Sequence, residues 1–411
     1  SIWLETARRG VQGIMAPACG GARMLLALAV LAAQSPWSAP GRALVALAMP
    51  CVPTLGGKML CCAADDMECL EKVQKAHGGK PQAPPPAVAE PPRPWLLGSV
   101  HTFANVSVWD RVSPFDVAVV GVPFGLEAGY EAPGMQLLRR EAQRIQPYSR
   151  LHGASLEELK VVDGQDLLAG GAARVAELEA AAAPFFRTGR PLVALGGDQS
   201  ITVPLLRAAS KAATEREAGP FAIVHIDKDL ATGSGSMEEE LGPHSALFWA
   251  AAGALFETRH SLHVGARGNL PSQRVELIDQ EIGFQTLSAE DVAMLGVSEI
   301  VKRIRQRLTR RDGTVMPAYL SVDLDVLDPA SFARAGPEVG GLSVSQLRAL
   351  LAGLRPFCQV VGAEVRGVGP LYEPEAIRVA AAIAHDLVLL AGKKQESREV
   401  VPPPLRATSD L

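Results

Sequence analysis

The sequence predicts an α/β fold in which a mostly parallel β-sheet lies between layers of helices. Two observations lead to this prediction. Short apolar segments alternate with amphipathic ones across residues 95–395, as they do in chains built of strand–helix units. The short segments are apolar at almost every position, which is typical of strands buried on both faces of a sheet. The 411 residues, 48% of them hydrophobic, suffice for one large domain with an extension.

This alternation assigns each segment in turn. The predicted strands are Asp116–Gly121, Lys160–Val162, Pro191–Leu195, Phe221–Ile226, Ser261–Val264, Ala318–Leu324 and Gln359–Val365. The predicted helices are Met135–Ile145, Ala172–Arg187, Thr202–Ala213, Ser288–Leu308, Ser345–Leu354 and Pro374–Leu390. In a parallel sheet of this kind, ligands bind at the edge formed by the carboxyl ends of the strands.

The front of the chain has the features of a targeting segment. Residues 1–80 form a predicted leader, in which Arg23 precedes the apolar run Met24–Ala33. That layout is typical of a secretory signal peptide, and the run is too short for a stable membrane span. A second moderately apolar stretch, Ala43–Pro53, has few acidic residues. The pair of segments indicates import into an organelle, with the plastid as the candidate; secretion and a cytoplasmic location are the alternatives.

Cysteine and proline usage separates the front of the chain from the rest. Five of the six cysteines precede residue 70, and they either pair in disulfides or belong to a leader that is removed. Residues 81–94 form a proline-rich linker, residues 95–395 the main domain and residues 396–411 a disordered tail. The formal charge of −4 gives no argument for a nucleic-acid partner, and we expect none.

Two pairs of aspartates follow predicted strands. Asp323 and Asp325 stand at the end of the apolar run Ala318–Val322, and Asp227 and Asp229 follow a similar run. Residues i and i+2 of a strand share a face, so each pair directs two carboxylates the same way. These carboxylates repel each other unless a cation lies between them. The sequence therefore predicts one shared metal site; the alternative is that the carboxylates cap backbone amides.

The chain also carries a collinear series of motifs that resembles the ureohydrolase family of arginase, agmatinase and their relatives. The motifs are Gly121–Phe124, Tyr130–Gly134, Gly196–Ser200, Val224–Ala231, Pro243–Ser245, Ser321–Pro329 and Gly336–Leu342. The resemblance is nearest to the agmatinase branch and implies a three-layer α/β/α sandwich around a sheet of about eight strands. It also implies a homo-oligomer, trimeric or hexameric, that hydrolyses a small guanidino or amidino compound with a hydroxide bridging two Mn²⁺ ions.

Half of the metal ligands that the resemblance implies are replaced. Those kept are Asp227, Asp323 and Asp325, and the replaced ones are two histidines, now Gln199 and Asp229, and an aspartate, now Ala231. One ion would face Gln199, Asp227, Ala231 and Asp323, so its site is badly damaged. The other would have four carboxylates, a set that suits Mn²⁺, Mg²⁺ or Ca²⁺. We therefore expect one divalent cation or none. Lys228, between two of these carboxylates, is expected to point to the opposite strand face.

The residues implied for substrate binding depart as well. Gly367 stands where the family has the glutamate that pairs with the guanidinium, and Arg366 beside it would repel a cationic substrate if it faced the pocket. His244 matches the family's proton-shuttling histidine and is the candidate catalytic residue. His225 and His263 lie in apolar strands and are expected to be structural.

Three functions stay open on these residues. The first is a ureohydrolase-fold protein that has lost dinuclear-manganese catalysis and serves as a scaffold or regulatory subunit. The second is an amidino or amide hydrolase that uses one metal ion and His244. The third is an ordinary agmatinase-type hydrolase, for which the missing ligands would have to come from elsewhere.

Overall fold

The computed structural model describes residues 51–53, 59–61, 101–123, 133–167, 174–233, 244–332, 335–368 and 374–393. The chain divides into two units, Ser1–Pro94 and Trp95–Leu411. In the first unit, β1 (Cys51–Pro53) pairs antiparallel with β2 (Met59–Cys61), and Cys51 lies opposite Cys61. The predicted signal run, the proline-rich linker, the tail and most of the turn at 130–134 lie outside the described residues and stay predictions.

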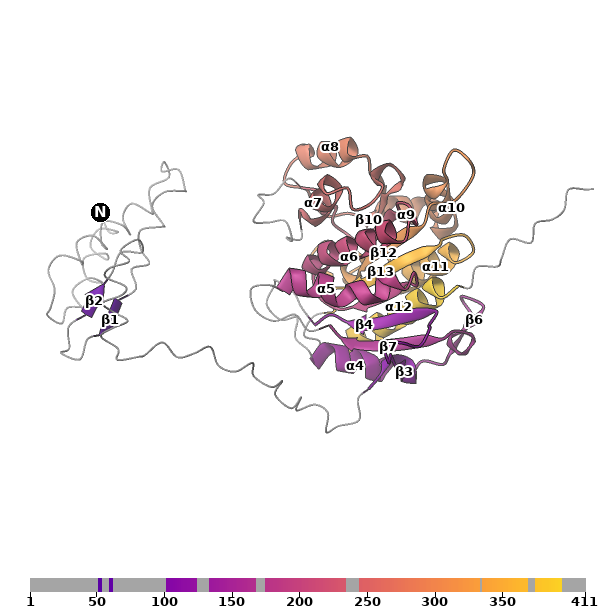
Figure 1. Ribbon diagram of the computed structural model, residues 1–411. Helices are drawn as coiled ribbons and strands as arrows, with labels where there is room; N and C mark the ends of the chain where they lie inside the picture. Colours follow the sequence, from indigo (N-terminus) through magenta and orange to yellow (C-terminus); the bar gives the residue numbers. More distant parts are fainter. Residues whose placement is uncertain are drawn as a thin grey trace, which may run out of the picture. The chain divides into compact units, whose positions relative to one another are not determined.

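The second unit is built on a parallel sheet (Figure 1). Within the described residues it has nine strands in the order β11-β10-β9-β12-β13-β8-β4-β7-β3, and each neighbouring pair is parallel. The strands are β3 (Ser107–Val108), β4 (Val117–Gly121), β7 (Val161–Asp166), β8 (Leu192–Leu195), β9 (Ala222–Ile226), β10 (Leu262–Ala266), β11 (Gln285–Ser288), β12 (Ala318–Asp323) and β13 (Val360–Arg366). All seven predicted strands are present, and the unpredicted β3 and β11 are the two edges.

Helices cover both faces of this sheet. They are α4 (Pro133–Ala142), α5 (Arg174–Arg187), α6 (Thr202–Glu215), α7 (Ala246–Ala252), α8 (Gln273–Ile282), α9 (Ala289–Leu295), α10 (Val297–Leu308), α11 (Val344–Leu354) and α12 (Pro374–Ala391). The α/β/α sandwich is confirmed. The single helix predicted over Ser288–Leu308 is wrong: Gly296, at φ 77° and ψ 156°, separates α9 from α10. The short α7 and the mostly exposed α8, whose one buried residue is Asp279, were not predicted.

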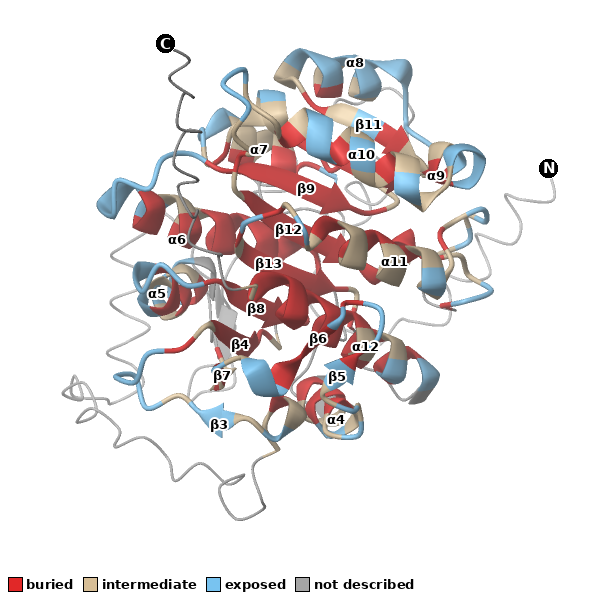
Figure 2. Ribbon diagram, turned by 90° about the vertical axis from the view of Figure 1, so that its right-hand side faces the viewer, coloured by how far each residue is buried: buried red, intermediate tan, exposed pale blue. Residues whose placement is uncertain are grey.

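Strand alternation divides the core into two layers. Val117 and Val119 of β4 belong to the hydrophobic cluster that contains residues of α4, α10, α11 and α12, whereas Ala118 and Val120 belong to the one that contains residues of α5, α6 and α7. Because successive strand residues point to opposite faces, an apolar strand supplies both layers at once. Figure 2 shows the sheet and the inward faces of its helices as one buried body. This burial on both faces explains why the strands are nearly all apolar.

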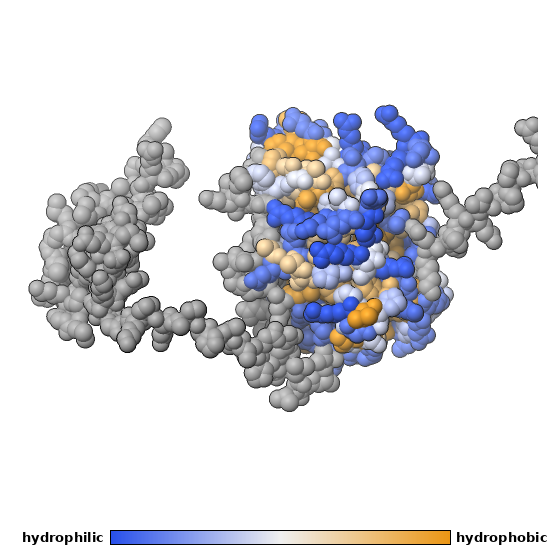
Figure 3. Space-filling view, in the orientation of Figure 1, coloured by the Kyte–Doolittle hydropathy of each residue, from blue (hydrophilic) through white to orange (hydrophobic). Residues whose placement is uncertain are grey.

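The surface contrasts with that interior. The face of the second unit seen in Figure 3 is mostly hydrophilic, with hydrophobic side chains in separate patches. Among the described residues, no helix has the length and hydropathy needed to cross a membrane.

A buried polar cluster lies beside the hairpin of β5 (Tyr148–Ser149) and β6 (Ala154–Ser155). Asp386 of α12 is fully buried and accepts two hydrogen bonds from Arg348 of α11, at 2.6 and 3.0 Å. His152 Nε2 lies 3.3 Å from Asp386 Oδ1. Neighbouring His385 is 2% exposed, and neither of its ring nitrogens has a hydrogen-bond partner among the described residues. Burial lowers the pKa of His385 to about 4, although Asp386 opposes the shift.

Because of this cluster, we expect the folded protein to lose stability in acid. We expect the substitution His385→Leu to reduce that loss. The unfolded chain binds a proton at His385 below about pH 6.5, whereas the folded chain does so only near pH 4. The free energy of unfolding should therefore fall as the pH drops from 6.5 to 4, by up to about 1.4 kcal/mol per pH unit from this group. Urea denaturation of both proteins at pH 7.5, 6, 5 and 4.5 measures the slopes. Parallel curves for wild type and variant would contradict the prediction.

Candidate functional site

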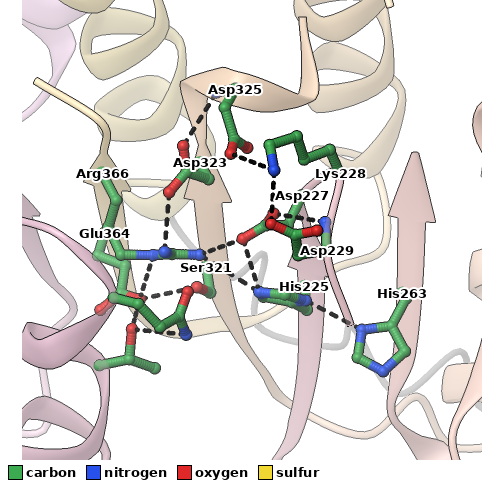
Figure 4. A network of polar contacts seen from close by, with 12 residues as sticks. His225, Asp227, Lys228, Asp229, His263, Ser321, Asp323, Asp325, Glu364 and Arg366 are labelled. Carbon is green, nitrogen blue, oxygen red and sulfur yellow. Dashed lines mark hydrogen bonds and ion pairs between the residues drawn. The ribbon is translucent and has the colours of Figure 1, made fainter. Parts of the chain in front are cut away.

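A row of polar side chains crosses the apolar sheet along one register. His263 of β10 lies opposite His225 of β9, His225 opposite Ser321 of β12, and Ser321 opposite Glu364 of β13. Residues in register on neighbouring strands direct their side chains to the same face, and here that face is the one covered by α6. Each of these four residues is completely buried. The row is therefore a polar floor beneath the carboxyl ends of the strands (Figure 4).

Two residues further along each strand, the same alternation places the charged groups. Asp323 lies opposite Arg366 on β13, and Asp227 follows β9, the other neighbour of β12. The two aspartate clusters, which the sequence places after strands, thus follow adjacent parallel strands. In addition, the structure brings Arg366, the last residue of β13, between Asp227 and Asp323 (Figure 4).

The guanidinium of Arg366 joins the two strands through their aspartates. Its Nη1 donates to Asp323 Oδ2 at 2.8 Å, and its Nη2 donates to Asp227 Oδ2 at 2.7 Å. The side chain is 1% exposed. Burial opposes its charge, but Asp323, Asp227 and Glu364 outweigh burial and raise the pKa of Arg366 further above its usual range. Arg366 therefore remains charged, and it neutralises part of the carboxylate cluster from within the protein.

Glu364 lies at the base of the site and forms an ion pair with Arg366. Its carboxylate accepts hydrogen bonds from Thr202 Oγ1 at 2.6 Å, Ser321 Oγ at 2.7 Å and Tyr319 Oη at 3.0 Å. The Nε of Arg366 lies 3.2 Å from Glu364 Oε1, an ion pair without hydrogen-bond geometry. Burial, followed by the charge of Glu364, raises the pKa of Tyr319 well above its usual value, so its hydroxyl stays a donor.

Lys228 is a second internal cation, and its predicted direction was wrong. Its Nζ donates to Asp229 Oδ2 at 2.6 Å and lies 3.6 Å from Asp325 Oδ2. Strand alternation does not apply to Lys228 because β9 ends at Ile226 and the chain bends there. Burial opposes the charge of Lys228, but Asp229 and Asp325 outweigh burial and raise its pKa.

The four predicted carboxylate ligands do not all converge. Oxygens of Asp227, Asp323 and Asp325 lie within 4.8 Å of one another, whereas Asp229 pairs with Lys228 outside this group. Asp325 itself belongs to a 3-10 turn, η8 (Leu324–Val326), rather than to the strand. Burial, with Asp323 and Asp227 nearby, raises the pKa of Asp325 well above its usual range. Its Oδ1 is buried and has no hydrogen-bond partner among the described residues.

The alternative of backbone capping is also seen. Asp323 Oδ1 accepts the amide N–H of Asp325 at 2.9 Å, and Asp227 Oδ1 accepts that of Asp229 at 2.8 Å. Each of these carboxylates thus uses one oxygen to hold the turn after its strand and the other to bind Arg366. Both oxygens of each group have partners within the protein.

The replaced ligand positions offer little to a metal ion. Gln199 is buried in the turn η5 (Gln199–Ile201), where its Nε2 lies 3.4 Å from Thr202 Oγ1. Ala231 is 4% exposed and packs in the hydrophobic cluster that includes α6 and α7. A methyl group supplies no donor atom, so the second ion of the implied pair has no ligand at this position.

Of the two positions implied for substrate chemistry, Gly367 lacks its group and His244 keeps its histidine. Gly367 has φ 77°, and a Cβ there would lie 2.8 Å from Asp323 Oδ1. The backbone thus disfavours any side chain at the position of the family's glutamate. His244 is exposed, and in the described part of the chain its imidazole makes no hydrogen bond or ion pair with the carboxylates; its carbonyl accepts from Gly233 N at 2.7 Å.

These residues as they stand do not fit a centre with two Mn²⁺ ions. Such a centre needs the oxygens of Asp227 and Asp323, which already bind Arg366 and backbone amides. It also needs donors at the positions of Gln199 and Ala231, where an amide and a methyl group lie. Neutral imidazoles and carboxylates are the usual ligands of manganese in proteins, and the required combination is absent from the described residues.

Comparison with known proteins establishes the family. The chain matches the Arginase family over residues 115–390, and it belongs to that family. It is similar to the agmatinase of Enterobacter sp. (strain 638), with 31% identity over 314 residues that cover 73% of this chain and 95% of the relative. The agmatinase of Escherichia coli O7:K1 is 30% identical over the same shares of the two chains.

A solved structure agrees on the fold. Proclavaminate amidino hydrolase from Streptomyces clavuligerus superposes with a TM-score of 0.61 at 24% identity, covering 72% of this chain and 98% of that structure. At this identity the likeness concerns the fold alone. The expected arginase-like architecture and the resemblance to the agmatinase branch are thereby confirmed.

Sequence reasoning did not place Glu364 in the site, and it named Arg366 and Lys228 without assigning them as the cations that pair with the carboxylates. A signal for two of them was available, because the apolar strands carry polar residues at every second position. Tyr319, Ser321 and Asp323 alternate in β12, as do Glu364 and Arg366 in β13. A polar period of two on a strand buried on both faces indicates one polar stripe. Assigning Arg366 to that stripe would have placed it beside Asp323.

Proposed function

We propose that this Arginase-family chain is a non-catalytic member of its family that works as a structural or regulatory subunit, most simply of a homo-oligomer. The observation that carries the proposal is the position of Arg366. Its guanidinium binds the two aspartates that would have to bridge a metal pair. An internal cation that is fully buried and paired with three carboxylates has a low tendency to leave them, because exposure would leave those charges unpaired.

The substrate side supports the same function. The agmatinase relatives suggest a guanidino substrate for an active member, and such a substrate is a cation. Here the position of the pairing glutamate is Gly367, and the charge bound to Asp227 and Asp323 is that of Arg366. A cationic guanidino substrate would therefore compete with the guanidinium of Arg366 for the same carboxylates.

A second candidate, a hydrolase with one metal ion, rests on the unpartnered oxygen of Asp325. Five carboxyl groups (Asp227, Asp229, Asp323, Asp325 and Glu364) surround two cations, Arg366 and Lys228. One weakly held Mn²⁺, Mg²⁺ or Ca²⁺ near Asp325 would reduce that excess of negative charge.

The test is metal content and turnover of the purified full chain. After saturation with Mn²⁺ and removal of the excess, we expect fewer than two ions per chain by elemental analysis. Urea release from agmatine and arginine should not exceed the rate without protein, while light scattering reports a stable oligomer. The Enterobacter agmatinase serves as the positive control. Two tightly held ions with urea release would overturn the proposal, and one ion with turnover would favour the second candidate.

A further inference from the structure

Four acceptors converge on the guanidinium of Arg366, as ligands converge on a metal ion. They are Asp227 Oδ2 at 2.7 Å, Asp323 Oδ2 at 2.8 Å, His225 Nε2 at 3.2 Å and Glu364 Oε1 at 3.2 Å. They come from β9, β12 and β13, three adjacent strands of the sheet (Figure 4). Asp325 offers a further oxygen within 4.8 Å of those of Asp227 and Asp323, and three aspartates with one imidazole form a ligand set of the kind that hard divalent cations accept.

The imidazole is turned toward Arg366 by a buried hydrogen-bond chain. A guanidinium only donates, so His225 Nε2 accepts from Arg366 Nη2. The neutral ring then carries its proton on Nδ1 and donates it to His263 Nδ1, which lies 2.9 Å away. At the other end, the carboxylate of Asp279 accepts from His263 Nε2 at 2.9 Å. Both ends of the chain require the same tautomers, so the hydrogen bonds by themselves assign a neutral His225 with its lone pair on Nε2.

In this tautomer the lone pair of His225 Nε2 faces the site. His225 Nε2 lies 3.1 Å from Asp227 Oδ2, and neither atom carries a proton in this arrangement. Two acceptors at that distance repel each other unless a cation lies beside both. Arg366 Nη2 is that cation, since it donates to both atoms.

We propose that Arg366 is the resident cation of this site, that it makes the fold independent of metal ions, and that removing its side chain creates a site for one hard divalent cation. The ligands of that ion are Asp227, Asp323, Asp325 and His225 Nε2. The inference rests on the proposed function in one respect. In the wild-type protein the positive charge at this site comes from Arg366, whereas active relatives would need bound metal ions there. Mn²⁺ is the preferred probe, because the set contains both carboxylates and an imidazole.

The test compares Arg366→Ala with a matched control, Arg139→Ala. Arg139 is also 1% exposed and binds carboxylates, those of Asp163 and Asp166, but two carboxylates only. Thermal unfolding is followed in EDTA and in about 1 mM Mn²⁺. Each variant should lose roughly 5–10 °C in EDTA, because each leaves buried carboxylates without their partner. Mn²⁺ should return at least about 3 °C to Arg366→Ala only.

Two further proteins sharpen the outcome. Wild type should change by less than about 1 °C between EDTA and Mn²⁺, and Arg366→Ala combined with Asp325→Asn should lose the gain. A wild-type gain as large as that of the variant would overturn the inference. So would the absence of any gain in Arg366→Ala, or an equal gain in Arg139→Ala.

The inference stays testable if Arg366→Ala does not fold in EDTA. Refolding from urea is then compared in Mn²⁺ and in EDTA, with Arg366→Lys as the variant that keeps a charge. Recovery of Arg366→Ala in Mn²⁺ alone supports the inference, whereas recovery in neither buffer, while Arg366→Lys folds, overturns it. The proposed function is judged separately, by urea release from wild type. The proposed function can therefore hold even if Mn²⁺ does not stabilise Arg366→Ala, and it can be wrong even if Mn²⁺ does.

Discussion

Glu364→Ala is expected to lower the free energy of unfolding by about 3–5 kcal/mol, a large fraction of the stability of a typical domain. Glu364 is fully buried and is the common acceptor of Thr202, Tyr319 and Ser321. Without its carboxylate, three buried hydroxyls lose their acceptor and Arg366 loses one of its three carboxylate partners. Unsatisfied buried donors and an unpaired buried charge are among the costliest changes that a single substitution can make.

Two control variants isolate the role of the Glu364 charge. Glu364→Gln keeps the shape and one acceptor oxygen, so it should cost about 1.5–3 kcal/mol, the value of hydrogen bonds to a charged group. Glu299→Ala removes a carboxylate of α10 that is 40% exposed and pairs with Lys302 and Arg303 on the surface. It should cost about 0.5 kcal/mol or less. Urea denaturation measures all three, and equal losses for Glu364→Ala and Glu299→Ala would show that the buried network does not stabilise the fold.

Gly341→Ala is expected to cost about 3 kcal/mol, because the added methyl group meets backbone and not a movable side chain. A Cβ at Gly341 would lie 2.6 Å from Asp328 N and 2.7 Å from Val326 O. In this stretch, Asp328 N donates to Leu342 O at 2.8 Å and Leu342 N donates to Val326 O at 3.0 Å. The glycine therefore lets two chain segments approach closely just after η8, the turn that holds Asp325.

Gly340→Ala is the matched control for Gly341→Ala. Nothing lies within 4 Å of a Cβ at Gly340, whose φ of 88° is the sole source of strain. That strain should cost about 1–2 kcal/mol. The free energy of unfolding in urea ranks the two variants. A smaller loss for Gly341→Ala than for Gly340→Ala would show that the close approach at Gly341 relaxes easily.

The layers of this protein could be predicted from local sequence alone. Runs such as Val117–Gly121 and Leu192–Leu195 are apolar on both faces, and this pattern depends only on burial by helices on each side. Where the local signal was weak, the prediction failed. Gly296 was read as an interior residue of a helix, although its positive φ ends one helix and begins another. The largely exposed α8 has only a narrow apolar row, Val275, Ile278 and Ile282, and its one buried residue is Asp279.

The candidate site, too, could be predicted only in part from the sequence. The sequence by itself determined that Asp227 and Asp323 end two parallel strands, that the ligand positions at Gln199 and Ala231 are empty of imidazole and carboxylate, and that the chain is an arginase relative. Only the tertiary structure decided what neutralises those aspartates. Arg366 is 43 residues from Asp323 and 139 from Asp227, and it meets both because β13 lies beside β12 with Arg366 opposite Asp323. Strand order and register are set by the packing of the whole sheet, and a charge on one strand acquires its partner only when that packing is complete.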